Sequence, residues 1–175
     1  MLVAECILDE NISRNRWRLS GMSLLTTFRP ATTADADAVS DVFLASRKEL
    51  VPWAPMAHSD HAVREWIRHD LIPRGGTTVA IRNGVVIGMM AVSDDGNVGW
   101  IDHLYMHPHA VGLGIGTTLL ARAKAELRSP IRLYTFQESV RARQFYERHG
   151  FTVIALGDGS GNEERYPDVL YEWSG

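Results

Sequence analysis

Three glycines, Gly112, Gly114 and Gly116, alternate in the segment GLGIG, between a β-rich stretch and a helical one. Glycine lets the backbone adopt positive φ and approach a ligand closely. The N–H groups of a helix's first turn have no intrahelical acceptor, and the helix dipole favours an anion beside them. The spacing therefore indicates a cradle for phosphate or pyrophosphate. A glycine turn needed only for packing is an equally open interpretation.

Two nucleotide-binding motifs fit this segment poorly. A Walker loop ends in Gly-Lys-Ser/Thr, but Thr117 follows Gly116 directly, without a lysine. A dinucleotide fingerprint, G-x-G-x-x-G, would need glycine at 117 and belongs to a βαβ unit. Here Asn83-Gly84 and Asp95-Gly96 predict antiparallel hairpins ahead of the glycines. A nicotinamide-dependent oxidoreductase is therefore disfavoured.

Composition narrows the class of protein. The chain has 175 residues, 45% of them apolar and 22% charged, with a net charge of -3, which favours an ordinary soluble domain. No Lys/Arg block supports nucleic-acid binding. The longest apolar run, 84–92, is too short to span a bilayer. Cys6 is the only cysteine, which excludes an intrachain disulfide. We expect a cytoplasmic protein without nucleic-acid or membrane partners.

Residues 1–23 differ from the rest because they show no stable hydrophobic period. The opening MLVAECIL carries Glu5 and lacks a basic n-region, so it makes a poor signal peptide. We expect a loosely attached N-terminal extension at 1–23 and one domain at 24–175.

Apolar spacing and turn residues predict the elements of this domain. Thr32 and Asp35 form a helix-start pattern, and Pro73 is expected beyond the end of a second helix. The expected strands are 25–29, 77–82, 85–92, 98–106, 131–136, 151–156 and 169–173, and the expected helices are 34–49, a second from about 60, 112–127 and one ending at Gly150. The order predicts an α/β fold, a mixed sheet with helices on both faces.

Three segments resemble the GNAT superfamily of acyl-CoA N-acyltransferases, and the resemblance extends over about 28–173. LYMHPHAVGLGIGTTLL, at 104–120, is similar to the family's acetyl-CoA motif R/Q-x-x-G-x-G/A. ESVRARQFYERHGF, at 138–151, is similar to its later helix ending A-x-x-F-Y-x-x-x-G-F. PDVLYEW, at 167–173, is similar to its closing strand. The three occur in family order and spacing, which makes the resemblance specific.

The resemblance implies that acetyl-CoA is a cosubstrate. Its pyrophosphate would lie on backbone N–H groups, and its pantetheine arm would pair with a strand that splays from strand 131–136. The implied pyrophosphate-binding residues are Gly112, Leu113, Gly114, Ile115, Gly116 and Thr117, and the implied arm-binding residues are Leu104, Tyr105, Met106 and Ser139.

Two positions depart from the family pattern. Val111 stands where Arg or Gln is usual, which removes one side chain but no backbone donor. Ser139 stands where Asn is frequent, and serine can still cap a helix and hydrogen-bond the arm. A sensor that holds acyl-CoA without turnover is therefore the alternative to an enzyme.

The resemblance also implies direct acetyl transfer to a primary amine of a small molecule or peptide. Tyr146 would protonate the CoA sulfur, although periodicity alone favours a core tyrosine. Asp102 is the first candidate for the general base, with an ordinary strand residue as the alternative. Strand alternation places Asp102 with Trp100 and Leu104, and His103 on the other face unless the strand bulges. A backbone N–H near Met106 would stabilise the oxyanion.

The acceptor would enter between 51–66, with Trp53, Met56, His58 and His61, and loop 157–165, with Asp158, Glu163 and Glu164. Core packing and a solvated loop are the alternatives for these segments. The spacing of His103, His107 and His109 does not support a metal site, and we expect no metal. The family also suggests a homodimer.

Overall fold

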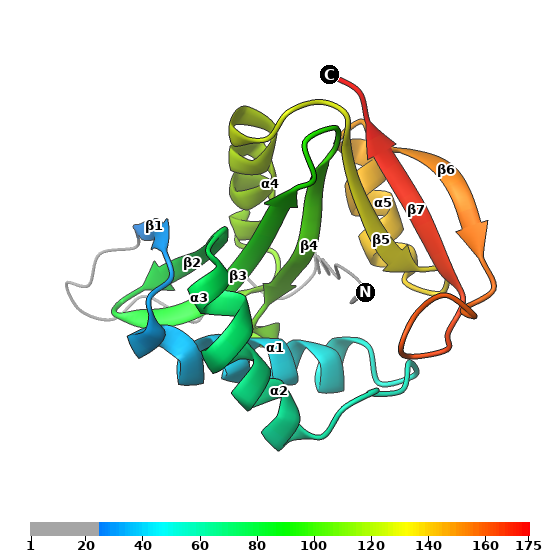
Figure 1. The fold of residues 1–175 in the computed structure, drawn as a ribbon. Coiled ribbons are helices and arrows are strands. Elements are labelled where there is room, and N and C mark those ends of the chain that lie inside the picture. Colours follow the sequence, from blue (N-terminus) through cyan, green and yellow to red (C-terminus); the bar gives the residue numbers. More distant parts are fainter. Residues whose placement is uncertain (1–24) are drawn as a thin grey trace.

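The computed structural model describes residues 25–175, which build one seven-stranded sheet with helices on both faces (Figure 1). The extension expected at 1–23 lies outside the described residues. Within them, no helix combines the length and the apolar character that crossing a membrane requires.

The order of the elements confirms the predicted mixed α/β fold. The strands are β1 (Thr26–Pro30), β2 (Thr77–Arg82), β3 (Val85–Asp94), β4 (Gly99–Met106), β5 (Ile131–Phe136), β6 (Thr152–Gly157) and β7 (Asp168–Trp173). The helices are α1 (Ala36–Leu50), α2 (Asp60–Trp66), α3 (Ile72–Arg74), α4 (Ile115–Glu126) and α5 (Val140–Arg148), with short turns η1 (Thr33–Asp35), η2 (Ile67–Leu71) and η3 (Pro108–Ala110).

Local chemistry explains where the first helices begin. The backbone N–H and the hydroxyl of Thr32 both donate to the Asp35 carboxylate at 2.8 Å, so the predicted helix start is confirmed. Ser59 accepts a hydrogen bond from the N–H of Ala62 and caps α2. The expectation that Pro73 follows the helix is wrong. A π-turn at η2 carries the helical segment into α3, so Pro73 lies within that segment, in the first turn of α3.

The sheet has the order β1-β2-β3-β4-β5-β7-β6. Strands β2, β3 and β4 form the predicted meander, and Asn83 and Gly84, both with positive φ, make the tight turn of its first hairpin. The parallel pair β4–β5 is very short, because only Gly99 and Trp100 pair, with Ile131 and Arg132. Beyond that point the two strands separate, as the resemblance implied (Figure 1).

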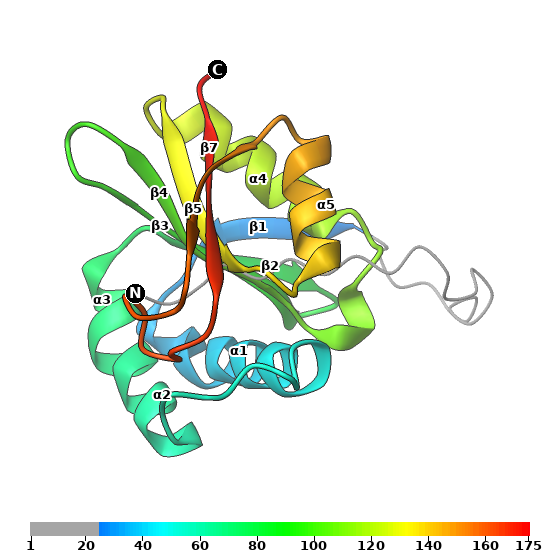
Figure 2. The same cartoon turned by 90° about the vertical axis from the view of Figure 1, so that its right-hand side faces the viewer.

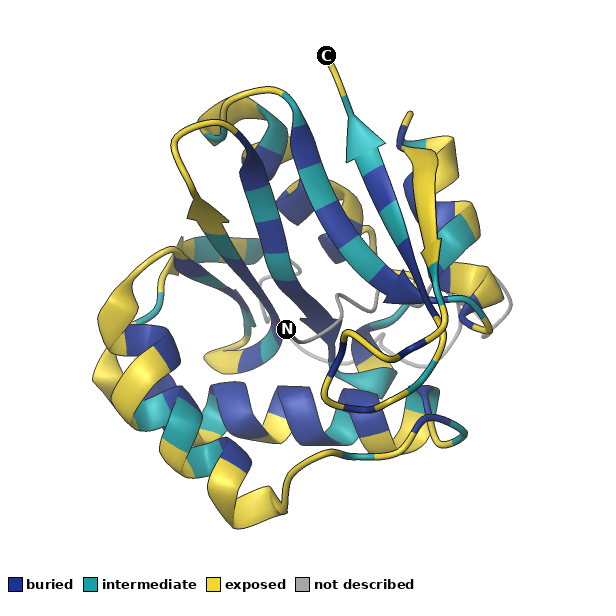
Figure 3. Ribbon diagram, turned by 45° about the vertical axis from the view of Figure 1, so that its right-hand side comes forward, coloured by how far each residue is buried: buried dark blue, intermediate teal, exposed yellow. Residues whose placement is uncertain are grey.

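The helices form two layers (Figure 2). Residues of α1 and α2, such as Phe43 and Val63, pack with Tyr105 on one face of the sheet. Residues of α4 and α5, such as Leu119 and Phe145, form the core on the other face. Figure 3 shows the buried residues along the central strands and on the inner sides of these helices. The parts of β4 and β5 that no longer pair, after Trp100 and Arg132, lie between the two helix layers.

Candidate functional site

A β-bulge on β4 determines which side chains face the site. Ala91 of β3 pairs with His103 and Val92 pairs with Ile101, so Asp102 is the extra residue. Leu104 packs with Ile101 in the α4–α5 core, three positions apart rather than two. Asp102 and His103 therefore line the same cavity. The strict alternation that grouped Asp102 with Leu104 is wrong, because the bulge shifts the side-chain period by one residue.

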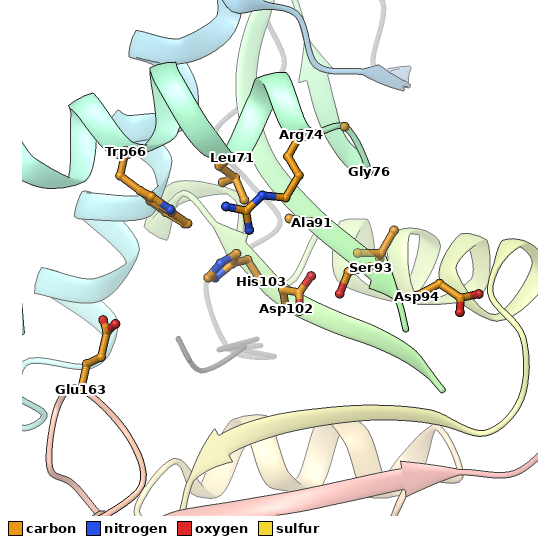
Figure 4. Close-up of a pocket in the computed structure, with 12 residues that line it drawn as sticks. Trp66, Leu71, Arg74, Gly76, Ala91, Ser93, Asp94, Asp102, His103 and Glu163 are labelled. Atoms are coloured by element: carbon orange, nitrogen blue, oxygen red, sulfur yellow. The ribbon is translucent and has the colours of Figure 1, made fainter. Parts of the chain in front are cut away.

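The cavity has a volume of about 510 Å³ (Figure 4). Trp66, Leu71 and Arg74 line it from the helical segment that precedes β2. The rest of the wall consists of Gly75, Gly76, residues 91–94 of β3, Asp102 and His103 of β4, and Glu163. This volume suits a small organic ligand.

Burial controls the charge states of the two neighbours on β4. Burial raises the pKa of Asp102, while a hydrogen bond from Ser93 and the charge of Arg74 oppose the rise. Burial lowers the pKa of His103 to about 3, and the charges of Arg47 and Arg74 act in the same direction. His103 is therefore neutral near pH 7, and its buried Nδ1 has no hydrogen-bond partner among the described residues. Asp102 is the stronger proton acceptor of the pair.

The two segments expected to form the acceptor wall meet at one hydrogen bond. His58 Nε2 lies 2.9 Å from Glu163 Oε2, and this contact lowers the pKa of Glu163. Trp53 instead packs its ring on Phe136 and Tyr166, with centroids 5.7 and 5.5 Å apart, which fits the core interpretation. Met56 packs beside the α1–α2 core and Asp158 accepts from the N–H of Ser160, so neither lines the cavity.

Sequence reasoning missed Arg47 and its relationship to Glu164. The Arg47 guanidinium donates to the carbonyl of Pro55 at 3.0 Å and lies 5.0 Å from the centre of the Phe136 ring. The spacing of residues along α1 already indicates that Arg47 is buried. Arg47 follows Val39 and Phe43 at intervals of four, so it lies on the buried stripe of α1. Arg74 and Ser93 were also missed, and no local pattern marks them.

The glycine turn has the geometry of an anion site. Gly112 and Gly114 have φ of 81° and 75°, and Gly114 precedes the first turn of α4. In the described part of the chain, no backbone acceptor bonds the N–H groups of residues 114–117. A Cβ built at Gly114 meets no atom within 4 Å, so the space beside the turn is open. The turn therefore fits a phosphate group.

The remaining expected cosubstrate residues lie along β4 and at α5. Leu104, Tyr105 and Met106 are buried and pair with β3, in the part of β4 from which β5 has separated. Ser139 occupies the N-cap position of α5, but its side chain makes no capping hydrogen bond within the described residues. The expected serine cap is therefore absent from this geometry.

Tyr146 lies in the core beneath the sheet. Its side chain is buried, and its ring centroid lies 5.8 Å from that of Phe151 and 6.1 Å from that of Tyr171. This packing accounts for the apolar residues at helical spacing in α5.

The histidines do not converge. The His107 and His109 rings lie 5.2 Å apart beside η3, whereas His103 packs against Phe43 and Trp66. The described residues contain no group of three or more His, Cys, Asp or Glu placed to hold a metal ion.

Comparison with known proteins defines the class. Residues 43–151 match the model of the acetyltransferase (GNAT) family, which is more than half of the chain. The chain therefore belongs to the GNAT acetyltransferase family. No curated protein matches it.

Solved structures share this fold. PaiA N-acetyltransferase from Thermoplasma acidophilum, in complex with coenzyme A, has a TM-score of 0.68 and 21% identity, covering 87% of this chain and 100% of its own. Apo-form YjaB from Escherichia coli has a TM-score of 0.70 and 18% identity, covering 87% and 99%. Arabidopsis thaliana Naa50, with the bisubstrate analogue CoA-Ac-MVNAL, has a TM-score of 0.64 and 18% identity, covering 86% and 99%. At such identities the likeness establishes the fold.

Proposed function

We propose that this protein is an acetyl-CoA-dependent N-acetyltransferase that transfers acetyl directly to a primary amine of a small molecule. One observation carries the proposal. The anion-binding turn before α4 and the cavity at Asp102 are both reached from β4, the strand that β5 leaves after Trp100. A cosubstrate bound at the turn and lying along β4 would bring its reactive end to the cavity.

The backbone around Gly114 would hold the cosubstrate's pyrophosphate, because the N–H groups of residues 114–117 lack backbone acceptors in the described residues. Gly112 and Leu113 complete the turn, and Ile115, Gly116 and Thr117 begin α4. The pantetheine arm would follow Leu104, Tyr105 and Met106 and pass Ser139 at the start of α5. Val111, which packs against the core, leaves these backbone donors in place.

In the proposed reaction the amine nitrogen attacks the thioester carbonyl carbon, and the carbon–sulfur bond breaks. Asp102 accepts a proton from the amine, directly or through water, and the raised pKa of this carboxyl makes it a better base. A backbone N–H near Met106 stabilises the oxyanion. Tyr146 returns a proton to the CoA thiolate. The products are an N-acetylated amine and CoA, and no enzyme nucleophile is needed.

The first experiment is a calorimetric titration of acetyl-CoA, followed by thiol release across a broad panel of amines. We expect acetyl-CoA to bind and CoA to be released continuously with at least one amine. No binding at millimolar acetyl-CoA would overturn the proposal. Binding without thiol release for any amine would instead favour the acyl-CoA sensor.

We also propose a homodimer formed through the edge strand β6. Thr152 through Leu156 are exposed, and Val153, Ile154 and Leu156 are 42%, 44% and 66% accessible. An apolar edge strand is a template for pairing with a second copy. Light scattering should give the dimer mass, and Leu156→Lys should shift it to the monomer. A monomeric parent protein would contradict the proposal.

A further inference from the structure

The charged groups around the cavity are not equivalent. Asp94 accepts hydrogen bonds from Arg128 Nε at 2.8 Å and from the N–H of Gly96 at 2.7 Å. Glu163 is hydrogen-bonded to His58. Among the described residues no cation lies within ion-pair distance of Asp102, whose one hydrogen-bond donor is the hydroxyl of Ser93. Asp102 is therefore the carboxylate in this wall that has capacity for an ammonium group.

Arg74 supplies the opposite charge. It is the last residue of α3, where Gly75 and Gly76, both with positive φ, turn the chain into β2. Its guanidinium points over Leu71 toward His103 and Asp102 (Figure 4). Within residues 25–175 it forms one ion pair, with Asp70 four positions earlier, and this pair is 3.7 Å long and exposed. Such a pair is weak, so the guanidinium can turn to a carboxylate ligand in a bidentate geometry.

The surface between these two charges is apolar. Trp66, Leu71 and Ala91 contribute apolar surface to the cavity. His103 adds a neutral ring whose Nδ1 is buried and unpartnered in the described residues. The wall thus combines a carboxylate without a cation partner among the described residues, a weakly paired guanidinium, an apolar patch and a neutral imidazole within a small volume.

We propose that the acceptor is a free amino acid with an apolar side chain, its ammonium group at Asp102, its carboxylate at Arg74 and its side chain against Trp66 and Leu71. This inference rests on the proposed function and names the substrate of the same site. The bound ammonium group first loses one proton through Asp102 to solvent, and the neutral amine then attacks the thioester carbonyl carbon. As the carbon–sulfur bond breaks, Asp102 accepts the second proton from the nitrogen and Tyr146 gives one to the thiolate, which yields an N-acetyl amino acid and CoA. A polyamine would place a second cation beside Arg74, and a peptide N-terminus would bring it no carboxylate.

The test compares matched acceptors in thiol release by the full chain. The pairs are L-leucine with isoamylamine and L-phenylalanine with phenethylamine, and spermidine serves as the polycation. We expect each amino acid to have at least tenfold higher kcat/KM than its decarboxylated partner. Arg74→Ala should lower kcat/KM for L-leucine about tenfold to a hundredfold more than kcat/KM for isoamylamine, mainly through KM. Arg74→Lys should retain part of the preference.

Arg68→Ala is the matched control, because Arg68 lies one to two turns earlier on the same helical segment and pairs with Asp37 outside the cavity. It should not alter the preference. Equal use of the decarboxylated amines, a preference for spermidine, or an unchanged preference in Arg74→Ala would each overturn the inference while leaving an acetyltransferase.

Titration of L-leucine into the protein with CoA present separates this inference from the proposed function. Binding that weakens in Arg74→Ala, without any turnover, would support the amino-acid site while the proposed enzyme fails. Absence of L-leucine binding and of L-leucine turnover would overturn the inference itself.

Discussion

The guanidinium of Arg47 lies 3.7 Å from the carboxylate of Glu164, and each side chain is only 1% exposed. The contact joins α1 to the loop between β6 and β7. Arg47 Nη1 and Glu164 Oε2 make no hydrogen bond among the described residues. Burial raises the pKa of Glu164, against the pull of the Arg47 charge. The two charges therefore depend on each other, because the attraction between them offsets part of the free-energy cost of burying each one.

Loss of one partner should destabilise the protein more than loss of both. Arg47→Met leaves Glu164 buried without its counter-ion and should lower the free energy of unfolding by about 3–5 kcal/mol. The double variant Arg47→Met, Glu164→Gln should recover most of this loss. Urea unfolding measures both values. A double variant as unstable as Arg47→Met would show that the charge pairing is not the cause.

Asp35 should make stability depend on pH at the acidic end. Its carboxylate accepts two hydrogen bonds of 2.8 Å from Arg29 as well as those from Thr32, and the Arg29 contacts lower its pKa far below the usual range. The stabilisation is present above the unfolded pKa of about 4 and is lost as the pH falls toward the folded value. Asp35→Asn should cost about 1–2 kcal/mol at pH 7, and the difference from the parent should shrink below about pH 4.

Asp37→Asn is the control for this prediction, because Asp37 is 71% exposed and pairs with Arg68 at the surface. It should change the free energy of unfolding by well under about 1 kcal/mol. A constant difference between parent and Asp35→Asn down to about pH 2 would contradict the linkage.

Gly114 permits a test of the proposed anion-binding turn in which the effect of backbone strain is distinguished from the effect on acetyl-CoA binding. Its φ is +75°, and a Cβ there would meet nothing within 4 Å, so Gly114→Ala suffers from conformation rather than from crowding. Gly84→Ala carries the same kind of strain at φ +78° in the β2–β3 hairpin, again in open space. Both should lose about 1 kcal/mol of stability. Only Gly114→Ala should weaken acetyl-CoA binding in calorimetry, and equal affinity in both variants would remove the turn from the binding site.

Sequence patterns that involve only neighbouring residues predicted most of the fold. The Asn83-Gly84 turn, the Thr32–Asp35 helix start and the apolar stripe of α4 each depend on near neighbours, and each is present. The exception is Pro73. A π-turn depends on how a helix packs, so the local sequence does not reveal that the helix continues past Leu71.

The site was only partly predictable, because its decisive features are not local. The bulge at Asp102 exists through pairing with β3, and it brings His103 to the same cavity. Arg74 faces that cavity because the Gly75-Gly76 turn returns the chain to the sheet. Arg47 was predictable in part, since its helical spacing already placed a charge on a buried stripe.

The hydroxyl of Tyr146 should matter to turnover rather than to cosubstrate binding. Tyr146→Phe keeps the buried ring that packs against Phe151 and Tyr171, so the fold should persist. If the hydroxyl protonates the departing thiolate, kcat should fall about 10²–10⁴-fold while the Kd for acetyl-CoA stays within about twofold. Stopped-flow thiol release and calorimetry measure the two quantities.

Tyr171→Phe is the matched control for Tyr146→Phe. The Tyr171 hydroxyl donates to Glu147 at 2.6 Å and accepts from Arg143 at 3.2 Å, so its loss should reduce stability and leave kcat near the parent value. Equal kcat for Tyr146→Phe and the parent, with chemistry rate-limiting, would exclude Tyr146 as the acid.

Ser93 gives the sharpest test of Asp102 as the base. Asp102 must be ionised to accept a proton, so kcat/KM should rise as the pH increases through its pKa, which burial raises above the ordinary aspartate range. The hydrogen bond from Ser93 stabilises the ionised carboxylate and lowers that pKa. Ser93→Ala should therefore move the acidic limb of the kcat/KM profile to higher pH, while the basic limb stays in place. Asp102→Asn should lose about 10²–10⁴-fold in kcat/KM at the optimum. An acidic limb that stays fixed or moves to lower pH in Ser93→Ala would show that another group accepts the proton.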